Sequence, residues 1–374
     1  MENGNQGCVK CVKTVEGELR KMLGDKRIYL VDYLGYTNKQ GEPIGHALKL
    51  LRQYVEILIE NFEVYVVAPK EIIRSIEKQE QINSIELKYH LIPYDGEVNF
   101  GEKAYKTYKR IWNIASALST GKKDVIWFYN VDFMLFKYLY YFHRNCSNIV
   151  CTMYQQDYGV KKSRIYYTVL SRMKHVFNTL DTFKADCNYT IIPDYYFDNK
   201  YEKYISPKKK EQVLCVGTMG GTKKLEKLIE IFSKIDYKLD LIGCFRDNNR
   251  FEKLLSKCKD NISISNKYLS DEEFYTKIGE SKYVILPYDE KDYNKRTSGI
   301  LQESIFLGTI PITYKSILKA NNLERSGTGI NSLDDLLTMD LRAVDMSVID
   351  NNKYLICTRY NKETVKEKVL RAFL

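Results

Sequence analysis

The sequence is poor in histidine and has no long apolar segment. It contains only four His in 374 residues, and none is paired with acidic residues at a spacing useful for catalysis, which argues against histidine-based acid–base chemistry. No apolar run reaches the length of a transmembrane helix, and residues 1–26 lack the apolar core of a signal peptide. We therefore expect a cytoplasmic protein whose membrane contact, if any, is peripheral, at the inner face of the cell membrane.

Cysteine is present, but not in the pattern of a metal site or a disulfide framework. The number of Cys is odd, nine, and most lie in apolar runs such as "VLCVG" (213–217). The one CxxC pair, Cys8 and Cys11, has no second pair at the spacing of a zinc site. We interpret the cysteines as reduced core residues and predict no bound metal.

The overall charge of the chain is positive. Lys and Arg number 58 against 48 Asp and Glu, which gives a formal charge of +10. Such a balance favours anionic partners such as nucleotides, acidic lipid or nucleic acid. The content of 44% hydrophobic residues fits a folded globular chain, and a length of 374 residues makes two domains the natural expectation.

Short β-rich runs alternate with amphipathic runs of helical length along the chain. In the first half a strand is predicted at 27–34, followed by a polar loop with glycine and a helix at 46–62. The second half repeats this order with a strand at 211–217 and a helix at 223–235. The order predicts an α/β fold of two tandem, doubly wound Rossmann-like domains, with ligands in the cleft between them.

The segment 201–212 is the best candidate for a linker between the halves. It is polar and contains Pro207 and three consecutive Lys. We therefore divide the chain into an N-terminal extension (1–26), a first domain (27–205), a second domain (206–350) and a C-terminal segment with a helix (351–374).

The most informative stretch is "KRTSGILQESIFLGTIPIT" (295–313). Thr297 or Ser298 suits the N-cap of a helix, because its hydroxyl can accept from the first free amides. Gly299 lets a ligand approach the backbone, and the helix start offers unpaired N–H groups to an anion. Arg296, just outside, can add a charged fork to a phosphate.

The same helix carries an acidic residue one turn after its start. Glu303 is four residues after Gly299, so both lie on one side of the helix, where a carboxylate can accept from ribose hydroxyls. Gly308 is predicted to stop the helix. The alternative is an ordinary capped helix with Glu303 on a solvent-exposed face.

This stretch resembles the donor-site helix of retaining GT-B glycosyltransferases, the group 1 or family 4-like enzymes. The matching positions in the motif are Gly299, Glu303, Ser304, Gly308 and Pro311. The runs "LCVGTMGGTKKLEKLIEIF" and "ISISNKYLSDEEFYTKIGESKYVILPY" resemble the first strand–loop–helix and the base-contacting segment of the same family. The likeness covers about 212–336, whereas the first half matches only in general layout. It also implies that the last helix crosses back to the first domain.

The resemblance implies roles for the residues that match. Glu303 would contact the nucleotide ribose, and the backbone at Thr297, Ser298 and Gly299 would hold the diphosphate. Two positions depart from the family pattern: Lys295 stands where the family has an acid, and Thr218 stands where a basic residue follows the loop glycine. We expect Arg296 to supply the missing positive charge.

Other donor-side and acceptor-side candidates follow from the same resemblance. Gly217 belongs to the first loop of the second domain, Lys223 or Lys224 matches the phosphate-binding Lys, and Tyr268 is placed to pack on the base. On the acceptor side, Gly45 and His46 resemble the glycine loop that faces the donor, with a plain strand–helix turn as the alternative. Tyr154 and Gln155 occupy the region where many relatives carry a His.

One further segment, "EKAYKTYKRIW" (102–112), combines basic and aromatic residues. Tyr105, Tyr108 and Trp112 share a helical face, and Lys103, Lys106 and Arg110 share another. Such a helix can lie on an anionic membrane. The commoner meaning, which we adopt as the expectation, is a buried aromatic face beneath solvated lysines.

Together these features predict a metal-independent, retaining glycosyltransferase that uses a UDP- or GDP-linked sugar and no other cofactor. Arg296 and Lys223 are the candidates to stabilise the leaving diphosphate. The acceptor would be a hydroxyl of a glycan or lipid-linked precursor, as in polysaccharide biosynthesis. The alternatives are an inverting transferase or sugar-nucleotide epimerase on the same fold, or a non-enzymatic protein that binds nucleotides or nucleic acid.

Overall fold

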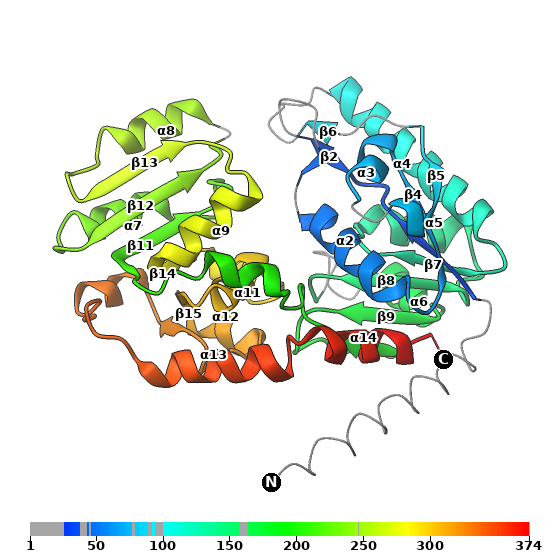
Figure 1. The fold of residues 1–374 in the computed structure, drawn as a ribbon. Helices are drawn as coiled ribbons and strands as arrows, with labels where there is room; N and C mark the ends of the chain where they lie inside the picture. The colour runs from blue at the N-terminus through cyan, green and yellow to red at the C-terminus, as the bar shows by residue number, and fades with distance from the viewer. Residues whose placement is uncertain are drawn as a thin grey trace, which may run out of the picture.

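The computed structural model describes residues 26–37, 43–44, 46–76, 79–88, 92–93, 100–156, 164–245 and 247–373. Within these residues the chain forms two large parallel sheets, one of seven strands and one of six, that lie side by side (Figure 1). A small third sheet of order β3-β2-β6 lies beside the first large sheet. Its strands are β2 (Tyr36–Thr37), β3 (Pro43–Ile44) and β6 (Ile92–Pro93). The predicted α/β architecture of two doubly wound domains is confirmed.

The first sheet has the strand order β10-β9-β8-β7-β1-β4-β5. Its strands are β1 (Arg27–Val31), β4 (Glu63–Ala68), β5 (Asn83–Glu86), β7 (Val125–Phe128), β8 (Ile149–Met153), β9 (His175–Asn178) and β10 (Tyr189–Ile191). Alternate residues of a strand point to opposite faces of a sheet, and β1 shows this directly. Ile28 and Leu30 join one buried cluster, whereas Tyr29 and Val31 join another.

Helices cover both faces of this sheet. The face of Ile28 and Leu30 is covered by α2 (His46–Leu58), α3 (Lys70–Arg74) and α14 (Lys362–Arg371). The opposite face is covered by α4 (Phe100–Thr120), α5 (Phe133–Phe142) and α6 (Arg164–Leu170). Apolar side chains on one stripe of each helix explain the packing, as for Leu51 and Val55 of α2.

The second sheet has the order β13-β12-β11-β14-β15-β16. Its strands are β11 (Lys210–Val216), β12 (Lys238–Gly243), β13 (Ile262–Asn266), β14 (Ser281–Ile285), β15 (Ile310–Tyr314) and β16 (Thr328–Ile330). The helices of this domain are α7 (Leu225–Phe232), α8 (Asn248–Leu255), α9 (Asp271–Glu280), α10 (Glu290–Tyr293), α11 (Gly299–Phe306), α12 (Lys315–Ala320) and α13 (Met346–Thr358).

The chain crosses between the domains twice, and the two crossings touch. The first crossing follows β10, and the second joins α13 to α14. The backbone N–H of Phe197 donates to the carbonyl of Tyr360 at 2.7 Å, and Phe197 forms a parallel bridge with Asn361. Helix α14 then packs on α2 of the first domain, where Lys362 and Lys366 form ion pairs with Glu56 and Glu60 at 2.6 and 2.5 Å.

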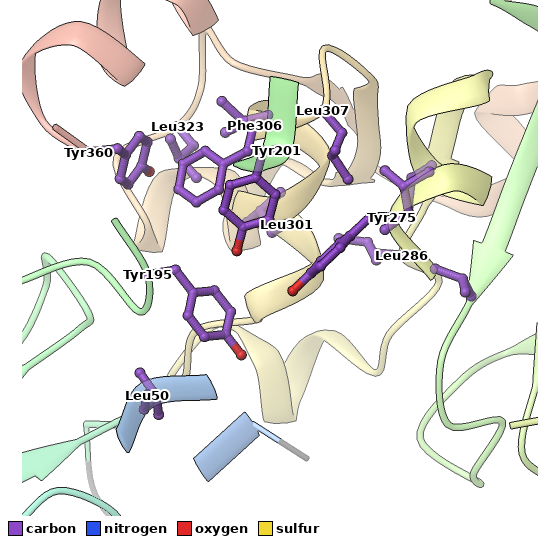
Figure 2. Packing of buried hydrophobic residues seen from close by; sticks show 14 of the residues in the cluster. Leu50, Tyr195, Tyr201, Tyr275, Leu286, Leu301, Phe306, Leu307, Leu323 and Tyr360 are labelled. Atoms are coloured by element: carbon purple, nitrogen blue, oxygen red, sulfur yellow. The ribbon is translucent and has the colours of Figure 1, made fainter. Parts of the chain in front are cut away.

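A hydrophobic cluster is continuous from the first sheet to the second at these crossings. Figure 2 shows part of it, with Leu50 of α2, Tyr195 of the first crossing and Phe306 of α11. The ring of Tyr201 contacts Tyr275 and Phe306 at centroid distances of 5.1 and 5.4 Å. The domains therefore share buried surface next to the crossings. The domain limits at 205 and 350 stay a prediction.

The expectation of a buried aromatic face on α4 is wrong. Tyr105, Tyr108 and Trp112 are 52, 59 and 60% exposed. The packing face of α4 is formed instead by Ile114, Ala117 and Leu118, further along the helix. In the part of the chain that the structure describes, no helix has both the length and the apolar character needed to cross a bilayer.

Candidate functional site

The two sheets direct the carboxyl ends of their central strands to a common cavity. In each sheet the strand order reverses direction beside the first strand, between β1 and β7 and between β11 and β14. Ligands of open parallel sheets bind at such points. Here Asn130 and Val131 after β7, and Gly217 and Thr218 after β11, line one cavity of about 570 Å³.

Most of the predicted site residues line this cavity. They come from both domains: Tyr154, Gln155, Gly217, Tyr268, Arg296, Thr297, Ser298, Gly299 and Glu303. The structure thus brings together residues that are far apart in the sequence. Their placement matches a site between the domains, whereas the role of each residue stays a prediction.

Backbone hydrogen bonds join a segment of the first domain to a segment of the second in the cavity wall. The N–H of Thr297 donates to the carbonyl of Tyr154 at 3.1 Å, and the N–H of Gln156 donates to the carbonyl of Lys295 at 2.7 Å. Gln155 and Arg296 form an antiparallel bridge between these two bonds. Arg296 is therefore fixed at its backbone by the first domain.

Helix α11 begins where the motif predicts. Ser298 is its N-cap residue, but its hydroxyl makes no capping bond and instead pairs with the Tyr288 hydroxyl at 2.9 Å. The Thr297 hydroxyl donates to Asp194 Oδ1 at 2.7 Å. The prediction that either hydroxyl caps the helix is therefore wrong, since both are bonded to other side chains. Gly308 has φ +62° after the last turn and ends the helix, as predicted.

Arg296 lies on a stack of two tyrosine rings. Its guanidinium carbon is 3.8 Å from the centroid of Tyr293, whose ring stacks on Tyr288 at 3.6 Å and 4°. Among the described residues, the buried Nε of Arg296 has no hydrogen-bond partner. Stacking fixes the plane of the guanidinium, so its N–H groups are pre-oriented for a planar or phosphate ligand at the cavity.

Glu303 is buried, so the alternative interpretation, an ordinary capped helix with Glu303 on a solvent-exposed face, is wrong. Its side chain is 3% exposed, and Oε1 lies 3.0 Å from Nζ of Lys49 in α2. Lys49 also lies 3.5 Å from Asp271 and over the rings of Phe274 and Tyr275. Burial raises the pKa of Glu303, and Lys49 opposes that rise.

Comparisons of sequence found nothing similar: no protein-family model and no curated protein matches the chain. Solved structures, by contrast, match nearly all of it. AviGT4, a glycosyltransferase involved in avilamycin A biosynthesis, is 12% identical with a TM-score of 0.58 over 93% of this chain and 97% of its own. HepE from Anabaena, in complex with UDP, is 11% identical with a TM-score of 0.63 over 92% and 98%. The chain has the GT-B fold.

A putative UDP-N-acetylglucosamine 2-epimerase from Listeria monocytogenes is similar to the same extent. It is 11% identical with a TM-score of 0.57 over 93% of this chain and 96% of its own. The GT-B fold therefore positions the site, and the reaction has to be inferred from the side chains in it.

Two lysines predicted to hold phosphate in the GT-B cleft do not line the cavity. Lys223 is buried, and its Nζ donates to the carbonyl of Val216 at 2.7 Å. Lys224 Nζ bonds to the hydroxyl of Tyr314 at 3.2 Å. The ammonium of Lys223 is thus bonded at the end of β11, beside Gly217, and the role of this lysine at the leaving group stays a prediction.

Three predictions fall on residues of which little is described. Gly45 lies outside the described residues, as do Cys8 and Cys11. His46 is the first residue of α2, and its side chain is not among the described parts of the structure. Lys49, one turn further along α2, does line the cavity.

Sequence reasoning missed Asp194, a buried carboxyl in the cavity wall. It is 2% exposed and follows the strand β10, at the start of the first crossing. Burial raises its pKa to about 6, against the hydrogen bonds of Thr297 and Thr179. An acid three residues after a strand was a usable signal, whereas its hydrogen-bond partners could not be predicted from the sequence. In the described part of the chain, no three His, Cys, Asp or Glu side chains gather as a metal site.

Proposed function

We propose that this protein is a glycosyltransferase that moves a sugar from a UDP- or GDP-linked donor to a hydroxyl of a glycan or lipid-linked acceptor. We further propose that the transfer retains the anomeric configuration, needs no bound metal and serves polysaccharide biosynthesis in the cytoplasm. The observation that carries the proposal is the start of α11. One interdomain cavity is lined by a pre-oriented Arg296, by the N-terminus of α11 and, one turn further along the helix, by the acid Glu303.

These residues suit the parts of a nucleotide-sugar in order. The diphosphate fits the start of α11 beside Arg296, where amides and a guanidinium favour negative charge. The ribose then reaches Glu303, and the base extends toward Tyr268, which follows β13. Gly217 has φ +96° at the end of β11 and allows close approach of the ligand there.

The chemistry asked of the protein is stabilisation of a leaving group. The bond between the sugar C1 and the phosphate oxygen breaks, the acceptor oxygen bonds to C1, and the acceptor proton is released. Negative charge grows on the diphosphate during this step. Arg296 and the amides of α11 are fixed in advance, so they stabilise that charge without reorganisation. HepE, which has a similar fold, binds UDP, and this supports a nucleotide in the cavity.

Nucleotide binding and product analysis test the proposal. Thermal unfolding is measured with UDP, GDP and their sugars, because a ligand at a hundred times its dissociation constant stabilises by about 2.7 kcal/mol. Glu303→Gln should remove the shift for the matching nucleotide, and Glu252→Gln, an exposed change on α8, should keep it. No shift with any nucleotide would exclude a donor site in this cavity.

The reaction is then identified by its products. Nucleoside diphosphate released only when an acceptor is present indicates a transferase. Interconversion of the nucleotide-sugar without an acceptor indicates an epimerase, the second candidate, which the similarity to the Listeria protein favours. Salt-sensitive binding to oligonucleotides with neither reaction would indicate a nucleic-acid-binding protein.

We also propose that helices α4, α5 and α6 contact an anionic membrane that presents the acceptor. On the solvent side of these helices, large aromatic residues are exposed: Tyr105, Tyr108, Trp112, Tyr141, Phe142 and Tyr167. Basic side chains lie among them: Lys106, Lys109, Lys137 and Arg164. Aromatic rings with adjacent cations suit the headgroup region of an acidic bilayer.

Vesicle sedimentation tests this contact. The wild type should bind vesicles with phosphatidylglycerol and not vesicles of phosphatidylcholine alone. Replacing Trp112 and Phe142 by Ser should abolish binding, whereas Tyr354→Ser, which changes an equally exposed tyrosine on α13, should not. Equal binding by all three proteins would refute the assignment of this face.

A further inference from the structure

The positive side chain that pairs with Glu303, the acid proposed to bind the ribose, comes from the other domain. Lys49 is in α2 of the first domain and Glu303 is in α11 of the second, 254 residues apart in the sequence. Their side chains are 20% and 3% exposed, and Nζ and Oε1 are 3.0 Å apart. An ion pair this deeply buried is costly to break on one side, because the remaining charge has no solvent.

The groups that face Glu303 come from four elements. They are Lys49 of α2, Asp271 and Tyr275 of α9, Tyr201 of the helix at 199–204, and Asp194 and Tyr195 of the first crossing. Figure 2 shows Tyr195, Tyr201 and Tyr275 gathered beside Leu301 of α11, with Leu50 of α2 nearby. Within this set Lys49 is the one cation. Within this set the second domain supplies Glu303 with the acid Asp271 and the phenol Tyr275, but with no cation.

This arrangement makes the state of Glu303 depend on where the first domain is. With α2 against α11, the ammonium opposes the effect of burial on the carboxyl pKa. One oxygen is held by Lys49, and the carboxylate keeps further lone pairs for hydroxyl donors. With α2 moved away, that charge is withdrawn from the ribose site. Lys49 itself is held firmly, since two aromatic rings lie within 5 Å of its Nζ.

We propose that Lys49 is a positioning residue that completes the ribose site from the first domain, so that tight nucleotide binding requires the two domains to be closed. It holds Glu303 as an oriented carboxylate, which then accepts from the ribose hydroxyls. The proposal rests on the proposed function, in which Glu303 is the ribose ligand. In this proposal the dependence of nucleotide affinity on domain closure comes from one side chain, Lys49, which contacts neither the sugar nor the bond that breaks.

The sign of the effect follows from the charge. In Lys49→Met the buried carboxyl has lost its cation, so its pKa rises and it takes up a proton at a higher pH. A protonated Glu303 loses charge-assisted acceptance from the ribose. Nucleotide affinity should therefore fall about ten- to hundredfold at pH 6 and recover as the pH is raised to 9. Lys49→Arg keeps the charge and should bind nearly as the wild type does at both pH values.

The experiment is calorimetric titration of UDP and GDP into wild type, Lys49→Met, Lys49→Gln, Lys49→Arg and Glu303→Gln between pH 6 and 9. Thermal unfolding without ligand shows which variants are folded, and Lys49→Gln replaces Lys49→Met if that variant is not. Glu303→Gln should be weak at every pH, and adding Lys49→Met to it should cost little more. Loss of affinity that recovers with pH in Lys49→Met alone supports the proposal.

Other outcomes overturn it in distinguishable ways. Unchanged affinity in Lys49→Met at every pH would show that Glu303 does not need the cation. Tighter binding would show that Lys49 competes with the ribose, and an equal loss at all pH values would show a purely structural role. If the wild type binds neither nucleotide, the proposed function fails first. If the wild type binds and Lys49→Met binds equally well, only the role of Lys49 fails.

Discussion

Replacing Asp194 by Asn should stabilise the protein at neutral and alkaline pH. Asp194 is buried, and burial raises its pKa from 3.8 to about 6 despite the hydrogen bond from Thr297. In the unfolded chain the same carboxyl titrates near its ordinary value. Between these two pKa values the folded protein keeps a proton that the unfolded chain releases, so stability falls as the pH rises through this window and stays lower above it.

The magnitude follows from the size of the shift. A difference of about two pKa units corresponds to about 3 kcal/mol of free energy of unfolding, lost in full above pH 7. Asn has nearly the same shape, and its amide oxygen can still accept from the Thr297 hydroxyl, but it carries no charge at any pH. We therefore expect Asp194→Asn to raise the free energy of unfolding by about 1–3 kcal/mol at pH 8. At about pH 3 the change should be small, because the carboxyl is then protonated in the folded protein and mostly protonated in the unfolded chain.

Urea unfolding at the two pH values, followed by circular dichroism, measures this difference. Asp236→Asn is the control, because Asp236 is exposed and its removal should not produce a gain that grows with pH. If Asp194→Asn destabilises the protein at pH 8, the charged form of Asp194 is favourable and the reasoning from burial is refuted. An equal change at both pH values would likewise show that charge is not the cause.

Three other expectations concern the start of α11 and the metal. Arg296→Ala should slow sugar transfer more than it weakens binding of the free nucleoside, because the partner of Arg296 would be the phosphate whose charge grows during transfer. Turnover is compared with nucleoside titration, and equal losses in the two would argue against a role of Arg296 at the phosphate. Gly299→Ala places a Cβ 2.8 Å from the ring of Tyr195 and should cost about 1–3 kcal/mol of stability by urea unfolding as well as nucleotide affinity; a neutral effect would show that the ring yields freely. Turnover should persist in a chelator, and complete loss that one divalent ion restores would contradict a metal-independent site.

The parallel architecture could be predicted because local sequence patterns indicate the strands and helices. Strands such as β7 and β15 are short runs of mainly apolar residues that are buried along their whole length, as expected of strands covered on both faces. Helices follow the strands at regular intervals. The start of α11 was equally visible, since a small polar residue, a glycine and a later glycine stop stand at fixed offsets. The helix was predicted to begin after Thr297 or Ser298 and to stop at Gly308, and α11 runs from Gly299 to Phe306.

The contents of the site could be predicted only in part, because its decisive contacts are not local. The partner of Glu303 is Lys49, and no pattern in either helix points to the other. The tyrosine stack beneath Arg296 and the bond of Lys223 to Val216 depend on how loops fold back on the sheet. Exposure of the α4 aromatics was missed because the helical period shows which residues share a face but not which face is buried.

The two connections between the domains lie side by side, so a rotation of one domain against the other would turn about the line of these crossings. A single connection would allow the halves to swivel in any direction, but the bond between Phe197 and Tyr360 joins two connections side by side. In such a rotation, groups far from the crossings would move most, and groups close to the crossings would move least. Asp194 precedes Phe197 by three residues, so its bond to Thr297 lies close to this pivot. A rotation of the domains about this line would thus leave the contact between Asp194 and Thr297 nearly undisturbed.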